Sequence, residues 1–117
     1  MPKFSLGTPP GPQALEIARV AQDLGCQRIW LFDSAALYED IWIWLDRIGR
    51  ETDIGLGTAV LVPNLRHVMT TASAAATIEH SCPGRLVLGF DTSKEPGAAE
   101  RARYDLFLNW ILNGAPY

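Results

Sequence analysis

The sequence predicts an α/β fold in which short parallel strands alternate with helices. Four strand-like segments begin at residues 3, 28, 54 and 85, and a helical pattern lies in each gap between them. Segments that are apolar at successive positions are typical of strands covered on both faces, so we expect a parallel sheet with right-handed crossovers. Two architectures fit this pattern: an open doubly wound sheet, or part of a (β/α)8 barrel, which takes roughly 250 residues when complete.

Length and composition indicate one domain with a compact core. The chain has 117 residues, of which 48% are hydrophobic and 20% are charged, a balance typical of globular domains. Ten basic and thirteen acidic residues give a net charge of -3, and no block of like charges stands out. This charge distribution argues against nucleic acid or an anionic membrane surface as a partner.

The first two strands and the helix between them have clear boundaries. Residues 3–6 form a short strand that the loop at 7–11 should interrupt. A helix is expected from Pro12, a residue suited to the first helical turn, to just before Gly25, a natural residue after a helix. The apolar run at 28–32 predicts the second strand.

The second helix should begin after Asp40, a plausible N-cap, and run to about Arg50. Its main apolar face comprises Ile41, Trp44, Leu45 and Ile48. Trp42 and Ile43 point elsewhere and would also need cover, so this helix is expected to have a second packing partner.

The remaining elements follow a strand at 54–66 that contains two glycines and stops at a Val-Pro-Asn sequence. They are a helix at about 68–80 with an alanine-rich run, a strand at 85–90 and a last helix at 98–112. The small side chains of the third helix would let another helix approach closely.

Several kinds of site find no support in the sequence. No Gly-rich phosphate loop of either common type occurs at a strand end. His67 and His80 have no accompanying ligands for a metal, and Cys26 and Cys82 are expected to be reduced thiols. No apolar run approaches the roughly 18 residues of a membrane helix, and the N-terminus lacks a signal-peptide pattern, so we expect a cytoplasmic protein.

Ligand sites in both candidate architectures lie at the carboxyl ends of the strands. These ends are residues 7–8, 33–34, 59–64 and 89–93. Asp33 could contact a ligand there, or it could satisfy amides of the loops, as Asp at a strand-to-loop junction usually does.

A series of short motifs appears in a fixed order along most of the chain. They are Asp33-Ser34 with Tyr38, Leu56 to Val60 with Pro63 and Arg66-His67, Thr71 to Thr77, Ser81-x-x-Gly84-Arg85 and Leu88-Gly89. In order and spacing the chain resembles the luciferase-like family of flavin- and deazaflavin-dependent oxidoreductases, which are (β/α)8 barrels. The resemblance extends from residue 3 to about residue 117.

The resemblance implies an oxidoreductase that binds FMN or the deazaflavin coenzyme F-420 and acts on a small molecule, as a monooxygenase or a hydride-transfer reductase. The implied cofactor-binding residues are Asp33, Ser34, Thr58, Ala59, Val60 and Val62. Many members carry a non-prolyl cis peptide that matches the bond from Ala59 to Val60. The alternative is a trans bond, with Gly55 and Gly57 merely permitting close packing. No catalytic residue and no metal ligand is assigned.

Two departures from the family pattern leave other functions open. The turn at 89–93 keeps only the first glycine of the family's glycine-rich turn, and the chain holds four of the eight βα units. We therefore interpret residues 1–117 as a single domain that is truncated relative to a full barrel. It is expected to form a homodimer through the helices at 40–50 and 68–80, or to pair with a chain that completes the barrel. A non-catalytic flavin-binding or interaction subunit and an inactive fragment are the alternatives to an enzyme.

Overall fold

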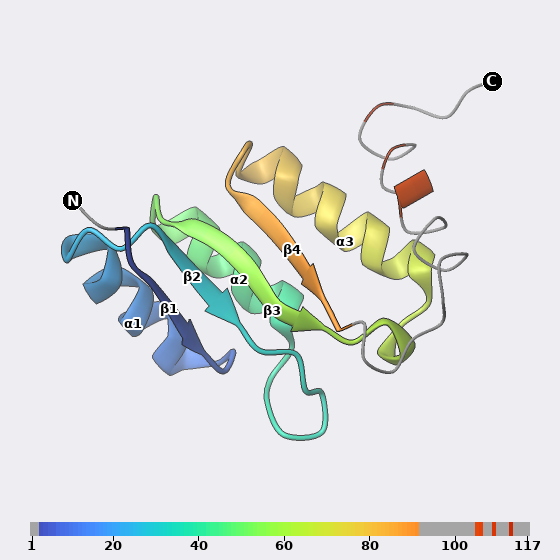
Figure 1. Ribbon diagram of the computed structural model, residues 1–117, viewed down its shortest axis with the longest axis horizontal. Helices are drawn as coiled ribbons and strands as arrows, with labels where there is room; N and C mark the ends of the chain where they lie inside the picture. The colour runs from blue at the N-terminus through green and yellow to red at the C-terminus, as the bar shows by residue number, and fades with distance from the viewer. Residues whose placement is uncertain (1–2, 92–104, 107–108, 110–112, 114–117) are drawn as a thin grey trace.

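A computed structural model describes residues 3–91, 105–106, 109 and 113 of the chain (Figure 1). Its four strands are β1 (Ser5–Thr8), β2 (Arg28–Leu31), β3 (Gly55–Leu61) and β4 (Leu86–Phe90). Its helices are α1 (Pro12–Asp23), α2 (Ile41–Glu51), the short 3-10 helix η1 (Pro63–Leu65) and α3 (Val68–Ser81). The alternation of strands and helices expected from the sequence is confirmed over this range.

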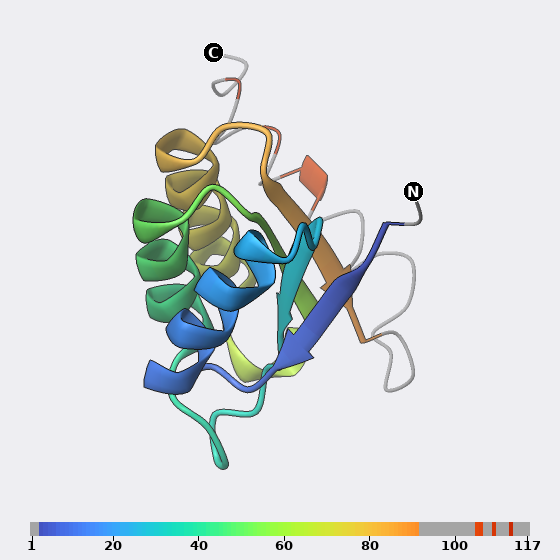
Figure 2. The ribbon, with the colours of Figure 1, turned by 90° about the vertical axis from the view of Figure 1, so that its left-hand side faces the viewer.

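The sheet decides between the two architectures that the sequence left open. All neighbouring strands are parallel, and their order in the sheet is β1-β2-β3-β4, the same as their order in the chain. Helices α1, α2 and α3 all lie on one face of the sheet (Figure 2). An open doubly wound sheet carries helices on both faces, so the described residues form an arc of a (β/α)8 barrel.

The ends of the helices follow the local chemistry of the sequence. The Asp40 carboxylate accepts a hydrogen bond from the Ile43 N–H at 2.9 Å and so caps the start of α2, as predicted. Gly25 follows α1 with a φ of 81°, a conformation that suits glycine after a helix. His67 caps α3, because its Nδ1 accepts the Met69 N–H at 3.1 Å.

The core lies between the sheet and the helices. Side chains that alternate along β2 and β3 meet the inner faces of α1 and α2 in a layer that includes Ala14, Ala18, Ile29, Leu31, Leu45, Ile48 and Leu56. The expected second packing partner of α2 is present, since α2 contacts both α1 and α3. Trp42 is covered, with 8% of its surface exposed, and belongs to this core. Ile43, by contrast, is 68% exposed.

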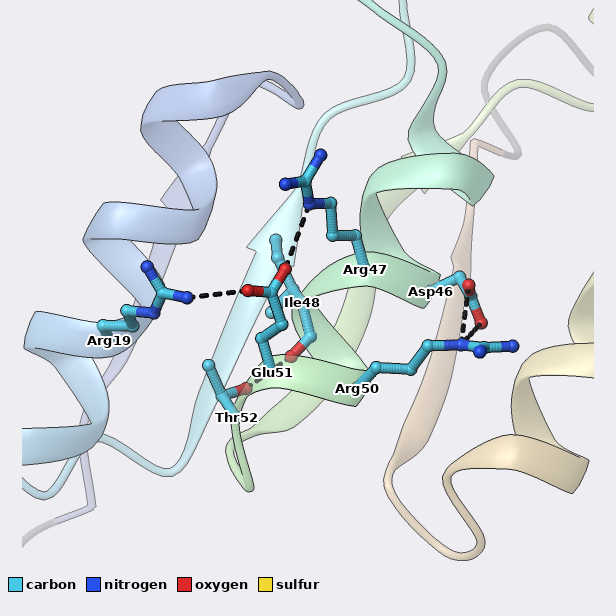
Figure 3. Close-up of polar contacts among 7 residues, drawn as sticks. All are labelled: Arg19, Asp46, Arg47, Ile48, Arg50, Glu51 and Thr52. Carbon is cyan, nitrogen blue, oxygen red and sulfur yellow. Dashed lines mark hydrogen bonds and ion pairs between the residues drawn. The ribbon is translucent and has the colours of Figure 1, made fainter.

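The outer surfaces of α1 and α2 carry ion pairs (Figure 3). Glu51 accepts hydrogen bonds from Arg19 at 2.8 Å and from Arg47 at 3.0 Å, and so joins the two helices. Arg50 pairs with Asp46 one helical turn away at 3.0 Å. Pairs as exposed as these contribute little each, typically below about 1 kcal/mol.

Two arginines donate hydrogen bonds to backbone carbonyls near the amino ends of the strands. Arg85 donates to the carbonyls of Gly49 at 2.8 Å, Thr52 at 2.8 Å and Ile54 at 2.7 and 3.0 Å. The Arg28 guanidinium donates to the carbonyl of Leu56 at 2.6 Å and to that of Arg85. Burial lowers the pKa of Arg28 below its ordinary value. Since this end of a barrel is the one that serves stability, Arg85 has a structural role.

Several boundaries differ from the prediction. The first strand covers Ser5–Thr8 and not residues 3–6, because Gly7 and Thr8 continue the ladder opposite Trp30 and Leu31. Strand β2 ends one residue earlier and β4 begins one residue later than expected. Most of the predicted helix at 98–112 lies outside the residues that the structure describes. Within this range the structure describes residues 105–106 and 109, and these are helical.

Candidate functional site

The carboxyl end of β3 is the most irregular part of the sheet. The pairing of β3 with β4 runs in register up to Thr58, shifts, and resumes at Leu61 opposite Phe90. The peptide bond between Ala59 and Val60 inside this shift is cis, which confirms the prediction for that bond. The irregular segment lies at the edge where a parallel βα sheet binds its ligands.

The Thr58 side chain fixes β4 at the start of the register shift. Its hydroxyl donates to the Gly89 carbonyl at 3.0 Å and accepts the Gly89 N–H at 2.9 Å. A Cβ on Gly89 would lie 2.6 Å from the Thr58 carbonyl oxygen, so the close approach of the two strands requires glycine there. Thr58 is fully buried, so it supports the strand end from below and is not itself exposed to a ligand.

Asp33 lies at the centre of a second set of contacts. Its carboxylate forms a bidentate ion pair with Arg66, with both N–O distances at 2.7 Å. Oδ2 also accepts the Val62 N–H at 3.0 Å. Of the two roles considered for Asp33, satisfying a loop amide is therefore present in the structure, and contact with a cofactor stays a prediction.

The remaining predicted residues present backbone and small apolar side chains. Val60 is 41% exposed, and Ala59 and Val62 are half-buried. Ser34 is half-buried as well, and its carbonyl accepts the N–H groups of Leu37 and Tyr38 in a turn. Such a surface fits the face of a flat aromatic ring system and offers no acid or base of its own.

Bulky side chains of β2 and of Phe32, the residue after it, cover glycines of the neighbouring strands on the sheet face opposite the helices. A Cβ on Gly57 would lie 2.4 Å from the Trp30 ring, and one on Gly7 would lie 3.0 Å from the Phe32 ring. The Arg28 guanidinium is 5.8 Å from the centre of the Trp30 ring. This row of residues 28, 30 and 32 lines the face that points to the interior of a barrel.

Other chemistry finds no support in the part of the chain that the structure describes. Within that part, no three His, Cys, Asp or Glu side chains are grouped so as to hold a metal ion. Both cysteines are free, and Cys82 packs against Gly49 of α2, away from the carboxyl ends of the strands. Among the same residues, no helix has the length and apolarity needed to span a membrane.

The structure brings together residues that the sequence could only place on separate strands. Asp33 and Val62 are joined directly, whereas Thr58 is directed to β4. In the sequence Arg66 stands out only as part of a motif, and its pairing with Asp33 is not among the predictions. A signal was present, since an acid at one strand end and a base just after the next strand are brought close by parallel neighbours.

The fold and the position of this site define the class of the protein. Parallel βα units in sequential order, with α1, α2 and α3 on one face and an irregular strand end on the ligand-binding edge, form part of a TIM-type barrel. The sequence then identifies the family: the profile described as luciferase-like monooxygenase matches residues 4–106. The chain belongs to this family.

Solved structures support the same assignment. The coenzyme F-420-dependent tetrahydromethanopterin reductase from Methanopyrus kandleri is 29% identical, with a TM-score of 0.67 over 88% of this chain. The structure of apo-MsnO8 has a TM-score of 0.76 at 22% identity over 98% of the chain. The oxygenating constituent of 3,6-diketocamphane monooxygenase from Pseudomonas putida, in complex with FMN, has a TM-score of 0.69 at 11% identity over 93%.

The chain covers only part of each of these proteins: 29% of the reductase, 45% of MsnO8 and 38% of the diketocamphane enzyme. No protein of curated function matches the sequence. The neighbours at 22% and 11% identity support the fold, and the family profile supports the membership.

Proposed function

We propose that this chain belongs to a flavin- or deazaflavin-dependent oxidoreductase and binds FMN or coenzyme F-420 at the carboxyl end of β3. The observation that carries this proposal is the tethered, partly exposed apolar segment from Ala59 to Val62, in a chain of the luciferase-like family. Two structural neighbours add support, since one is named for its dependence on F-420 and another contains FMN.

Under this proposal the six predicted residues divide into two groups. Ala59, Val60 and Val62 contact the ring of the coenzyme through backbone and apolar atoms, and Ser34 contributes from the adjoining turn. Asp33 and Thr58, whose side chains are buried, hold that surface in place. The bound coenzyme would supply the hydride or oxygen chemistry, while the protein orients it and excludes water.

We propose that the substrate is a small molecule and that the protein binds it in the cytoplasm. Whether the chain acts as a monooxygenase or as a hydride-transferring reductase depends on its reaction with oxygen. Consumption of oxygen that matches the oxygenated product formed would favour the monooxygenase, and reduction of the substrate by the reduced coenzyme without consumption of oxygen would favour the reductase.

Assembly is part of the proposal, because the chain covers less than half of each neighbour. We propose a homodimer through the helices at 40–50 and 68–80, where Ile43 and Met69 are exposed in the first turns of α2 and α3. Pairing with a chain that completes the barrel is the alternative. A single monomeric species by light scattering at micromolar concentration would contradict the homodimer.

Binding is tested by titrating the purified chain with FMN and, separately, with F-420, and following absorbance and tryptophan fluorescence. We expect saturable binding that Val60→Asp weakens at least tenfold. Val20→Asp is the matched control, because Val20 is also exposed but lies on α1, outside the site. The absence of binding to both coenzymes would overturn the proposal.

A non-catalytic flavin-binding subunit is the second candidate. It is favoured by the end of β4, where Phe90 and Asp91 follow Gly89 in place of a glycine-rich turn. Saturable binding of coenzyme without reduction by NADH or NADPH, or by any added reductase, would support this candidate.

A further inference from the structure

We propose that the ion pair between Asp33 and Arg66 is a clamp that sets the conformation of the segment from Val60 to Arg66 and so positions the coenzyme surface. The inference rests on the function proposed above and assigns Arg66 to the site as a positioning residue. Neither side chain needs to touch the coenzyme for this role.

The clamp holds the segment at two points. The Asp33 carboxylate binds the guanidinium of Arg66 through both oxygens, and Oδ2 binds the Val62 N–H as well. Between these two points the Val62 carbonyl accepts the Leu65 N–H at 3.2 Å and η1 turns the chain. One buried carboxylate on the loop after β2 thus fixes both the entry and the exit of this turn.

The Val62 N–H explains why an anchor is needed at this position. Strand β3 ends at Leu61, whose carbonyl accepts the N–H of Asp91, the residue after β4, at 2.8 Å. The following N–H, on Val62, has left that ladder and finds the Asp33 carboxylate instead. This anchor therefore holds the backbone at Val62, two residues from the exposed Val60.

Burial distinguishes this pair from the ion pairs on α1 and α2. The Asp33 side chain is 1% exposed and that of Arg66 is 15% exposed, whereas the pairs on α1 and α2 are far more open to water. A bidentate, charge-assisted pair with little solvent is rigid, and removing one partner leaves the other charge buried without it. A clamp of this kind responds strongly to substitution at either residue.

Hydrogen exchange tests the clamp without any coenzyme. In Arg66→Met and in Asp33→Asn we expect the Val62 amide to exchange at least tenfold faster than in the wild type, while the amides of Trp30 and Leu31 in β2 keep their protection. Arg50→Met, which removes an exposed ion pair on α2, is the matched control and should leave Val62 unchanged. Unchanged exchange of Val62 in both clamp variants would overturn the inference.

Coenzyme titration then tests the link to the site. We expect Arg66→Met to weaken FMN binding at least tenfold and to change the shape of the absorption band of the bound flavin, and Arg66→Lys to restore part of both. Equal affinity and an identical spectrum in Arg66→Met would overturn the positioning role. If the wild type binds neither FMN nor F-420, the proposed function fails, and so does the effect of the clamp on coenzyme binding. The hydrogen-exchange data still show whether the clamp holds the Val62 amide.

Discussion

Arg85 shows how much of this fold can depend on one side chain. Its guanidinium binds the last carbonyls of α2 and of the turn into β3, which have no partner within the helix. The arginine of the Gly-Arg motif therefore stabilises the end of the sheet opposite the candidate site.

We expect Arg85→Met to lower the free energy of unfolding by about 3 kcal/mol, since buried carbonyls would lose a charged donor. The measurement is urea denaturation followed by far-UV circular dichroism. Arg50→Met should change the same quantity by less than about 1 kcal/mol, because its ion pair is exposed. Equal losses in the two variants would contradict the structural role of Arg85.

Gly89 is required by space and not by backbone conformation. We expect Gly89→Ala to cost about 2 kcal/mol of stability, because the new Cβ would meet the Thr58 carbonyl at 2.6 Å and backbone cannot move aside easily. Gly84→Ala, where φ is 74° and no atom lies within 4 Å, should cost about 1 kcal/mol. Thermal unfolding of both variants gives the comparison, and a smaller loss at residue 89 than at residue 84 would refute the steric explanation.

The residues that sequence reasoning placed correctly are those whose partners are close in the chain. Asp40 caps α2 through an amide three residues away, and Gly25 ends α1 by its own conformation. Asp33 and Arg66 are 33 positions apart. Their pairing depends on which strands are neighbours and in which register, and this is not encoded in any local pattern.

Strands β3 and β4 lose their regular backbone pairing next to the candidate site. The register shift between Thr58 and Leu61 removes regular ladder bonds, and the Thr58 hydroxyl replaces them with two bonds to Gly89. One side chain therefore joins two strands next to the proposed coenzyme surface.

Thr58→Val keeps the shape of the side chain and removes both bonds. We expect a loss of about 2 kcal/mol of stability, because the N–H and carbonyl of Gly89 would lose the hydroxyl as a partner at a partly buried position. Thr58→Ser retains the hydroxyl and should cost about 1 kcal/mol for the lost methyl group. Chemical denaturation measures both, and the expectation fails if serine is as damaging as valine.

The faces of the helices were only partly predictable. Periodicity gave the buried face of α2 but placed Trp42 outside it, because a helix between a sheet and a second helix buries a wider face than one packed on a sheet alone. The first strand was misplaced for a related reason. Gly7 is a turn residue by composition, yet the neighbouring β2 holds it in the ladder.

For the whole molecule, ligand binding should be visible as stability. At free FMN a hundred times its dissociation constant, linkage adds about 2.7 kcal/mol to the folded state. For a domain of this size the melting temperature should then rise by about 10 to 20 °C. Differential scanning fluorimetry measures the shift, with adenosine monophosphate as the control because it carries a phosphate but no flavin ring. Equal shifts with both compounds would contradict a site for the ring.

The choice between barrel and open sheet also belongs to this scale. Both architectures use the same alternation of strands and helices, so no single segment distinguishes them. The sequential strand order and the placement of all three helices on one face do so only once the segments are packed.

The large side chains of Trp30 and Phe32, at the end of β2 and just after it, limit which substitutions this chain can accept. Trp30 occupies the space above Gly57, and Phe32 occupies the space above Gly7, so each volume is shared between two strands. Enlarging a glycine alone would collide with its neighbour, and shrinking Trp30 alone would open a void. A larger residue at one position of such a pair should therefore be tolerated only together with a smaller residue at the other. We expect a mutant library that varies residues 30 and 57 together to yield more folded members than a library that varies either residue alone.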